Sequence, residues 1–228
     1  PWVPFAGVHA GKLIGEDATK VYSDLDTLKK SLMEAHKLYR PDGQPVMFDL
    51  QIEAEALGCE LMWAKDAPPT VSSHPLEKDK EIPDTIPGPE DGRIPLALEA
   101  TKHLVKEVGD STAIYGLFCG PFTLASHLRG TNIFMDFFQD PDYVHSLLDY
   151  STRVGMQMAR LYAEAGAIVL APVDPLVSQI SPKHFNQYLH EPYTRLHDYI
   201  RELERFSSFF VCGDATKNIE VMCKTKPD

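Results

Sequence analysis

The sequence has few cysteines, no long apolar run and no excess of positive charge. Its 228 residues include four cysteines, 22 Lys and Arg against 33 Asp and Glu, and a formal net charge of −11. Four scattered thiols are too few for a disulfide framework in a chain of this length. No apolar run approaches the ~20 residues of a membrane helix. The acidic balance argues against a nucleic-acid groove, which needs clustered Lys and Arg.

The remaining composition, 43% hydrophobic and 24% charged, is that of an ordinary globular chain. The start, PWVPFAGVHA, lacks the charged and apolar regions of a signal peptide. We therefore expect a cytoplasmic protein that binds no nucleic acid and no membrane. Because strand-like segments stand at both ends, we expect residues 1–228 to form one partial domain of a longer polypeptide.

Apolar segments alternate with helical patterns along the chain. Strands are predicted at 2–7, 45–48, 112–118, 167–171 and 208–211, with a short one at 60–63. Helices are predicted at 24–39, 52–58, 96–108, 140–165, 181–205 with an interruption near Pro192, and from 216. Near-continuously apolar strands between helices indicate parallel pairing. The spacing predicts an α/β fold, a (β/α)8 TIM barrel of which the chain covers roughly five strands; an open doubly wound sheet is the alternative.

A proline-rich segment interrupts this alternation. Seven of the eighteen prolines lie between Pro68 and Pro95. Proline has no backbone N–H and is unfavourable inside helices and central strands. We expect a surface excursion at about 66–95 that is either a lid or an insertion.

Polar residues follow each of the five main predicted strands. In parallel α/β folds the strand ends share one cavity, so these residues are candidates for function. They are His9, Lys12, Asp49, Glu53, Cys119, His127, Asp174, Gln179, Cys212 and Asp214. Structural interpretations stand beside the functional ones, because Asp caps turns, free Cys packs in cores and His127 can be a satisfied helix residue. Glu53 and Glu55 are expected on a solvated helix face.

Four stretches at the predicted strands carry a resemblance to one superfamily. They read WVPFAGVHAGKL, FDLQIEAEALG, CGPFTLASHLRG and EAGAIVLAPVDPLVSQISPKHF, in this order. Together they resemble uroporphyrinogen decarboxylase and the corrinoid-dependent methyltransferases, the URO-D superfamily. The resemblance implies a (β/α)8 barrel.

The decarboxylase branch has an Asp that holds the pyrrole N–H groups, and Asp49 matches it. The arginines that bind the substrate's carboxylates in that branch are replaced here by Val8 and Lys12, and its Tyr is replaced by His127. Buried carboxylates need cationic partners, so these differences weaken the decarboxylase interpretation.

The methyltransferase branch fits CGPFTLASHLRG and EAEALG better. The resemblance implies transfer of a methyl group between a cobalamin, carried on a small corrinoid protein, and a thiol or similar acceptor activated by zinc. Cys212 matches one zinc ligand of the branch's His-x-Cys motif, whereas Phe210 stands in place of the His.

We therefore predict a corrinoid-dependent methyltransferase that uses methylcobalamin and, through Cys212, zinc. Asp49 and His127 are the predicted catalytic residues, and the predicted substrate-binding residues are His9, Lys12, Cys119, Gly120, Asp174 and Gln179. Predicted partners are the corrinoid protein and a small-molecule methyl acceptor or a tetrapyrrole, with a homo-oligomer left open. The alternatives are decarboxylation of a porphyrinogen and a non-catalytic tetrapyrrole- or corrinoid-binding protein.

Overall fold

A computed structural model describes residues 1–228 and contains two sheets. The larger sheet has the strand order β1-β4-β5-β6, and all its pairs are parallel. Its strands are β1 (Gly43–Pro45), β4 (Ala113–Cys119), β5 (Val169–Val173) and β6 (Phe206–Ser207). The smaller sheet is an antiparallel pair of β2 (Leu61–Met62) and β3 (Thr70–Val71). The parallel pairing predicted from the apolar strands is confirmed.

Helices connect the strands and extend beyond them. They are α1 (Gly7–Lys12), α2 (Ala18–Val21), α3 (Leu25–Tyr39), α4 (Ile52–Ala56), α5 (Ile94–Val108), α6 (Pro121–Arg129), α7 (Asn132–Gln139), α8 (Pro141–Glu164), α9 (Pro182–His184), α10 (His190–Glu202) and α11 (Ile219–Cys223). Asp24 caps α3 by accepting the Thr27 N–H, and Asp140 caps α8 by accepting the Tyr143 N–H. No helix combines the length and apolar character needed to cross a bilayer.

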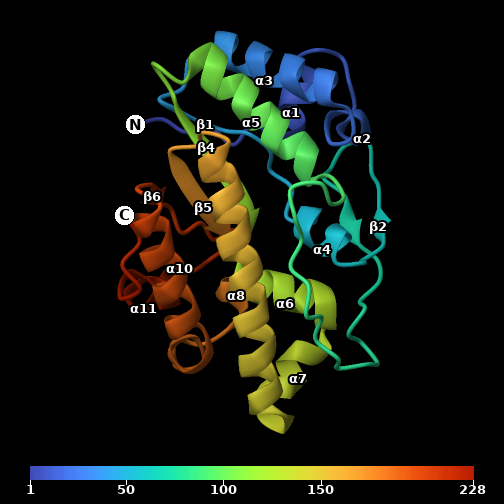
Figure 1. The fold of residues 1–228 in the computed structure, drawn as a ribbon, viewed down its shortest axis with the longest axis vertical. Coiled ribbons are helices and arrows are strands. Elements are labelled where there is room, and N and C mark those ends of the chain that lie inside the picture. Colours follow the sequence, from blue (N-terminus) through green and yellow to red (C-terminus); the bar gives the residue numbers. More distant parts are fainter.

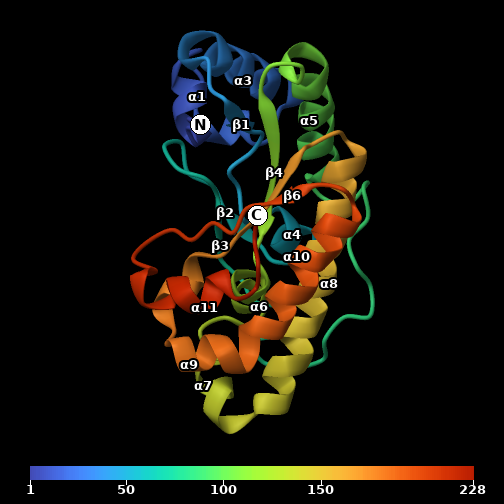
Figure 2. The same ribbon diagram turned by 90° about the vertical axis from the view of Figure 1, so that its left-hand side faces the viewer.

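Three helices, α5, α8 and α10, cover one face of the larger sheet (Figures 1 and 2). The approach of α8 to β4 is close, because a Cβ at Gly116 would lie 2.5 Å from Cγ of Tyr162. The opposite face carries a small apolar cluster of Leu117, Ala171 and Val173. Phe5, Phe48 and Phe210 pack against this cluster, so side chains far apart in sequence cover the inner face of the sheet.

The strand predicted at residues 2–7 is wrong. Residues 1–6 form no strand, and the Gly-containing segment after them is helical as α1. The Trp2 carbonyl does accept the N–H groups of Asp42 and Gly43, beside the start of β1. However, Pro4 has no N–H to donate, so a ladder cannot continue along this segment.

The last strand and the helix before it differ in detail from the prediction. β6 begins at Phe206 instead of 208, although Phe210 still forms a bridge with Val173. The helix after Pro182 passes through a π-helical turn at Phe185–Leu189 before α10 begins. Pro192 in the first turn of α10 cannot donate to the carbonyl four residues earlier, so the regular α-helical bonding is interrupted near it, as predicted.

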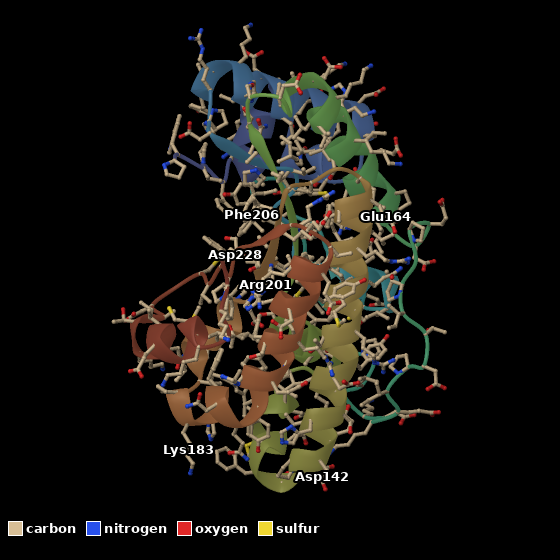
Figure 3. The ribbon with its side chains drawn as sticks, turned by 60° about the vertical axis from the view of Figure 1, so that its left-hand side comes forward. Asp142, Glu164, Lys183, Arg201, Phe206 and Asp228 are labelled. Atoms are coloured by element: carbon tan, nitrogen blue, oxygen red, sulfur yellow. The ribbon has the colours of Figure 1, made fainter.

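The last residues of the chain lie against β6. Asp228 and Arg201 are seen beside Phe206 in Figure 3. The Asp228 carboxylate accepts the Ser207 N–H at 2.9 Å, and Arg201 donates to the Lys226 carbonyl at 2.7 Å. The Asp228 carboxylate thus supplies β6 with a polar partner on the side that does not pair with β5, while Arg201 holds the chain end next to it.

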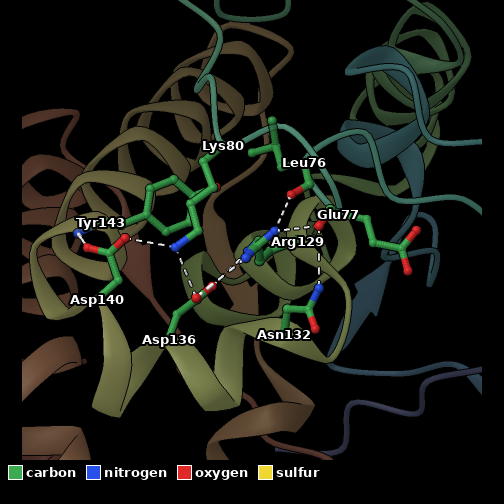
Figure 4. A network of polar contacts seen from close by, with 8 residues as sticks. All are labelled: Leu76, Glu77, Lys80, Arg129, Asn132, Asp136, Asp140 and Tyr143. Atoms are coloured by element: carbon green, nitrogen blue, oxygen red, sulfur yellow. Dashed lines mark hydrogen bonds and ion pairs between the residues drawn. The ribbon is translucent and has the colours of Figure 1, made fainter.

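The proline-rich segment is fastened to α6, α7 and α8 by a charged network (Figure 4). Arg129 donates to the carbonyls of Leu76 and Glu77 and pairs with Asp136 at 2.7 Å. Lys80 pairs with Asp136 at 3.1 Å and with Asp140 at 2.7 Å. We call Lys80, Arg129, Asp136, Asp140 and Tyr143 the charged network. The charged network holds the proline-rich segment against α6, α7 and α8.

Candidate functional site

The turn between β4 and α6, residues 119–123, is held by carboxyl groups from the units on both sides. The Cys119 N–H donates to Oε1 of Glu53 at 3.0 Å. The Phe122 and Thr123 N–H groups donate to Asp174 at 2.9 and 3.0 Å. Side chains that follow β1 and β5 therefore meet at the end of β4, as the strand-end argument predicts.

Asp174 uses both of its oxygens to hold this turn. Besides the two backbone bonds, it accepts hydrogen bonds from the hydroxyls of Thr123 and Tyr193, each at 2.6 Å. Burial raises the pKa of Asp174 to about 6, although these hydrogen bonds oppose the shift. A Cβ at Gly120 would lie 2.5 Å from the Cβ of Asp174, so glycine permits the close approach. Asp174 and Gly120 therefore stabilise the conformation of the turn.

Asp49 follows the end of β1 in the sequence, and its carboxylate is paired with Arg93. Its side chain is fully buried, and Arg93 donates to it at 2.5 Å and to Glu55 at 2.6 Å. Burial raises the pKa of Asp49, and Arg93 opposes the rise. Arg93 also lies over the ring of Trp63, with 4.9 Å between Cζ and the ring centroid. The guanidinium thus neutralises part of the acidic charge at this strand end.

Sequence reasoning missed Arg93 because its carboxylate partner Asp49 lies 44 residues away. The signal available was modest: Arg93 is the only arginine between residues 41 and 128, and it stands where the proline-rich segment meets a helix. A lone arginine after an acidic segment suits a buried ion pair, but its partner cannot be chosen without the fold.

Glu53 was expected on a solvated helix face, and the structure corrects this. The residue is 1% exposed because α4 packs against β4 and α6. Burial raises the pKa of Glu53 to about 7, while the hydrogen bond from the Cys119 N–H lowers it. Oε2 of Glu53 is buried and has no hydrogen-bond partner. This carboxyl is therefore suited to exchange a proton near neutral pH.

Cys119 at the end of β4 faces His127, which lies near the end of α6. Sγ of Cys119 lies 4.0 Å from Nδ1 of His127. Burial raises the pKa of Cys119 well above its usual value and lowers that of His127 to about 4. Both side chains are therefore neutral at physiological pH. We call Asp49, Glu53, Arg93, Cys119 and His127 the strand-end site.

Three other predicted substrate-binding residues make their polar contacts elsewhere. His9 bonds to the Tyr39 hydroxyl, Lys12 pairs with Asp66 at 3.4 Å, and Gln179 donates to Ser178. All three are exposed. No hydrogen bond or ion pair joins them to the strand-end site.

Cys212 and Phe210 stand at the position of the implied zinc ligands. Cys212 is half-buried against the apolar inner face, and burial raises its pKa. The Phe210 ring stacks on Phe5 with a centroid distance of 4.6 Å. Residues 1–228 contain no group of three His, Cys, Asp or Glu that could hold a metal ion. A zinc site needs at least three protein ligands, so the residues present do not fit one.

The molecule has parallel strands, outer helices and polar groups gathered at the strand ends. These features define an α/β fold of a class to which many enzymes belong. The model of the uroporphyrinogen decarboxylase (URO-D) family matches residues 6–228. The chain therefore belongs to the uroporphyrinogen decarboxylase family, and the predicted superfamily is confirmed.

Known proteins of two kinds are similar to the chain. Methylcobamide:CoM methyltransferase MtbA of Methanosarcina acetivorans is 29% identical over 90% of this chain and 62% of that protein. A solved structure of a methyltransferase from Methanosarcina mazei has a TM-score of 0.88 at 27% identity, covering 96% of this chain and 66% of that one. A uroporphyrinogen decarboxylase of Prochlorococcus marinus is 22% identical over 68% of this chain and 46% of that protein.

The chain spans about three fifths of the length of the curated methyltransferases that it matches. Within that part, the structural match confirms the predicted fold class, an incomplete (β/α)8 barrel. Four of the five main predicted strand positions belong to the parallel sheet.

Proposed function

We propose that the chain belongs to a corrinoid-dependent methyltransferase that moves a methyl group between a cobalamin and a thiol acceptor. The observation that carries the proposal is the similarity to methylcobamide:CoM methyltransferases, which exceeds that to the decarboxylases in identity and in extent. The proposed partners are a small corrinoid protein that bears the cobalamin and a small thiol.

The charges at the strand ends support the same choice. A substrate with many carboxylates requires cations that are free to pair with it. Arg93 is already paired with Asp49 and Glu55, and Lys12 is an exposed residue paired with Asp66. Val8 adds no charge. A neutral or weakly charged ligand is better suited to this end of the sheet.

The chain's own residues then have the following proposed roles. The side chains of Cys119 and His127 are neutral and add no net charge to the site, and Asp49 fixes Arg93 over the ring of Trp63. Cys212 presents a thiol at the inner face. The corrinoid, when bound, supplies the activated methyl group. No step is assigned to zinc, because the donors present do not fit it.

A decarboxylase is the second candidate, because Asp49 stands at the position of that branch's Asp. Its environment argues against this, because the Asp49 side chain is fully buried and both oxygens already accept bonds, one from Arg93 and one from the Gln51 N–H.

The purified protein, incubated with methylcobalamin and candidate thiols, tests the proposal. We expect the visible spectrum of methylcobalamin to change to that of the demethylated corrinoid when the acceptor thiol is present. Loss of carboxyl groups from a porphyrinogen, without demethylation, would establish the decarboxylase instead. Tight corrinoid binding with no turnover for any acceptor would identify a binding protein.

A further inference from the structure

The two buried carboxyls that hold the β4–α6 turn use their oxygens differently. Asp174 accepts four hydrogen bonds and has both oxygens engaged. Glu53 accepts the Cys119 N–H with Oε1, while its buried Oε2 has no partner. A carboxyl with every lone pair directed at a donor cannot bind a proton without losing a bond. Glu53 can bind a proton at Oε2 and still hold Cys119.

The position of Glu53 follows from how the sheet ends. The register of β1 and β4 ends at Pro45 and Tyr115, and the Val46 N–H donates to the Tyr115 carbonyl. Beyond that point β1 leaves the sheet, and Glu53 from α4 supplies the acceptor for Cys119. The carboxyl therefore substitutes for a strand neighbour at the residue that faces His127.

The charged and titratable groups around Glu53 come from each packed element. The negative charge of Asp49, before α4, raises the pKa of Glu53, and the positive charge of Arg93, before α5, lowers it. The Cys119 thiol on β4 and the Tyr162 hydroxyl on α8 are neutral, because burial raises the pKa of both. His127 on α6 is neutral as well, because burial lowers its pKa to about 4. None of these groups donates a hydrogen bond to Oε2.

We propose that Glu53 is a positioning residue of the strand-end site, and that gain or loss of a proton at its unpartnered oxygen changes its hold on the Cys119 N–H. The charged carboxylate accepts a stronger, charge-assisted bond from this N–H than the protonated acid does. Cys119 is thus held more tightly when Glu53 is ionised. The effect of Glu53 on Cys119 does not depend on the proposed methyl transfer. Only the reaction that this effect would serve rests on the proposed function.

The amide signals of the isotope-labelled protein test this hold directly. We expect the Cys119 amide shift to titrate with a midpoint of about pH 7, the pKa of Glu53. The Thr123 amide, held by Asp174, is the internal control and should titrate at about pH 6.

Glu53→Gln keeps an oxygen acceptor for Cys119 but cannot ionise. We expect it to make the Cys119 shift independent of pH near neutrality and to leave the Thr123 titration in place. Glu55→Gln, on the same helix but without a bond to Cys119, should preserve the Cys119 titration.

A Cys119 amide that does not titrate near neutral pH in the wild-type protein would overturn the inference, even if Glu53→Gln did not fold. Persistence of the titration in Glu53→Gln would also overturn it. If the amide titrates as expected but methylcobalamin is never demethylated, the proposed reaction fails and the role of Glu53 stands.

Discussion

The charged network and the strand-end site both bury ionised or ionisable groups, but they treat them in opposite ways. In the charged network, burial raises the pKa of Asp136, and the hydrogen bonds from Arg129 and Lys80 more than reverse this, so the net pKa is lowered. In the strand-end site, Glu53 has no cation bonded to it, and burial leaves its pKa raised. Full pairing produces a fixed structure, whereas incomplete pairing leaves a group that can exchange a proton.

The two regions therefore respond to pH in opposite directions. A lowered pKa means that the contribution of Asp136 to stability is present above its usual pKa of 3.8 and is lost as pH falls. A raised pKa means that the contribution of Glu53 is present below 4.5 and is lost as pH rises to about 7. Acid should therefore weaken the attachment of the proline-rich segment. Alkali should lower the free energy of unfolding through the cost of a buried charge on Glu53, although the bond from the Cys119 N–H is itself stronger in that state.

The largest expected effect is that of Arg129→Ala. The change removes the donors of two backbone carbonyls and leaves Asp136, 5% exposed, without its main partner. Breaking a buried pair from one side costs about 3–5 kcal/mol. Urea denaturation should show this loss in the free energy of unfolding, while Arg153→Ala, which breaks an exposed pair, should change it little. Equal effects of the two variants would show that the network is not a structural clamp.

Gly120→Ala should come next, because the added methyl group would approach the Cβ of Asp174 and the hydroxyl of Tyr193 within 2.6 Å. Overpacking of this kind costs about 1–3 kcal/mol. Thermal unfolding gives the size of the effect. Gly155→Ala is the comparison variant, because an added Cβ there would meet its nearest neighbour at an ordinary 3.6 Å and should cause no such loss. A Gly120→Ala protein as stable as the wild type would mean that Asp174 is not fixed against the turn.

Glu53→Gln should stabilise the protein at alkaline pH. The amide avoids the burial of a charge, and the shift from 4.5 to about 7 corresponds to an upper bound of about 3 kcal/mol at pH 8. Unfolding free energies at pH 5 and pH 8 measure this gain, which should be small at pH 5. A variant that is destabilised equally at both values would contradict a raised pKa for Glu53.

Lys80→Ala should have the smallest effect. The Lys80 side chain is 37% exposed, so water and salt screen its pairs with Asp136 and Asp140. Such pairs contribute less than about 1 kcal/mol, and the loss should shrink further in high salt. A large, salt-independent loss on denaturation would show that Lys80 is as much a part of the clamp as Arg129.

Local sequence signals predicted the longer helices α3, α5, α8 and α10. The caps at Asp24 and Asp140 are short-range features. Asp49, Cys119 and Asp174 do lie after the ends of parallel strands, as the apolar strand pattern indicated, while their functional roles stay predictions. The pairing of Arg93 with Asp49 and the burial of Glu53 depend on how α4 and α5 pack. No local pattern contains that packing, because a Glu on a short helix resembles a solvated residue. The segment at 2–7 is apolar but forms no strand, because Pro4 has no N–H to donate to a ladder.

The most direct test of the account is the pH dependence of methylcobalamin demethylation by the wild-type protein and by Glu53→Gln, with folding of both verified by circular dichroism. The account predicts that the wild-type rate changes with a midpoint of about pH 7 and that this step is absent in the variant. Identical pH profiles for the two proteins would contradict it.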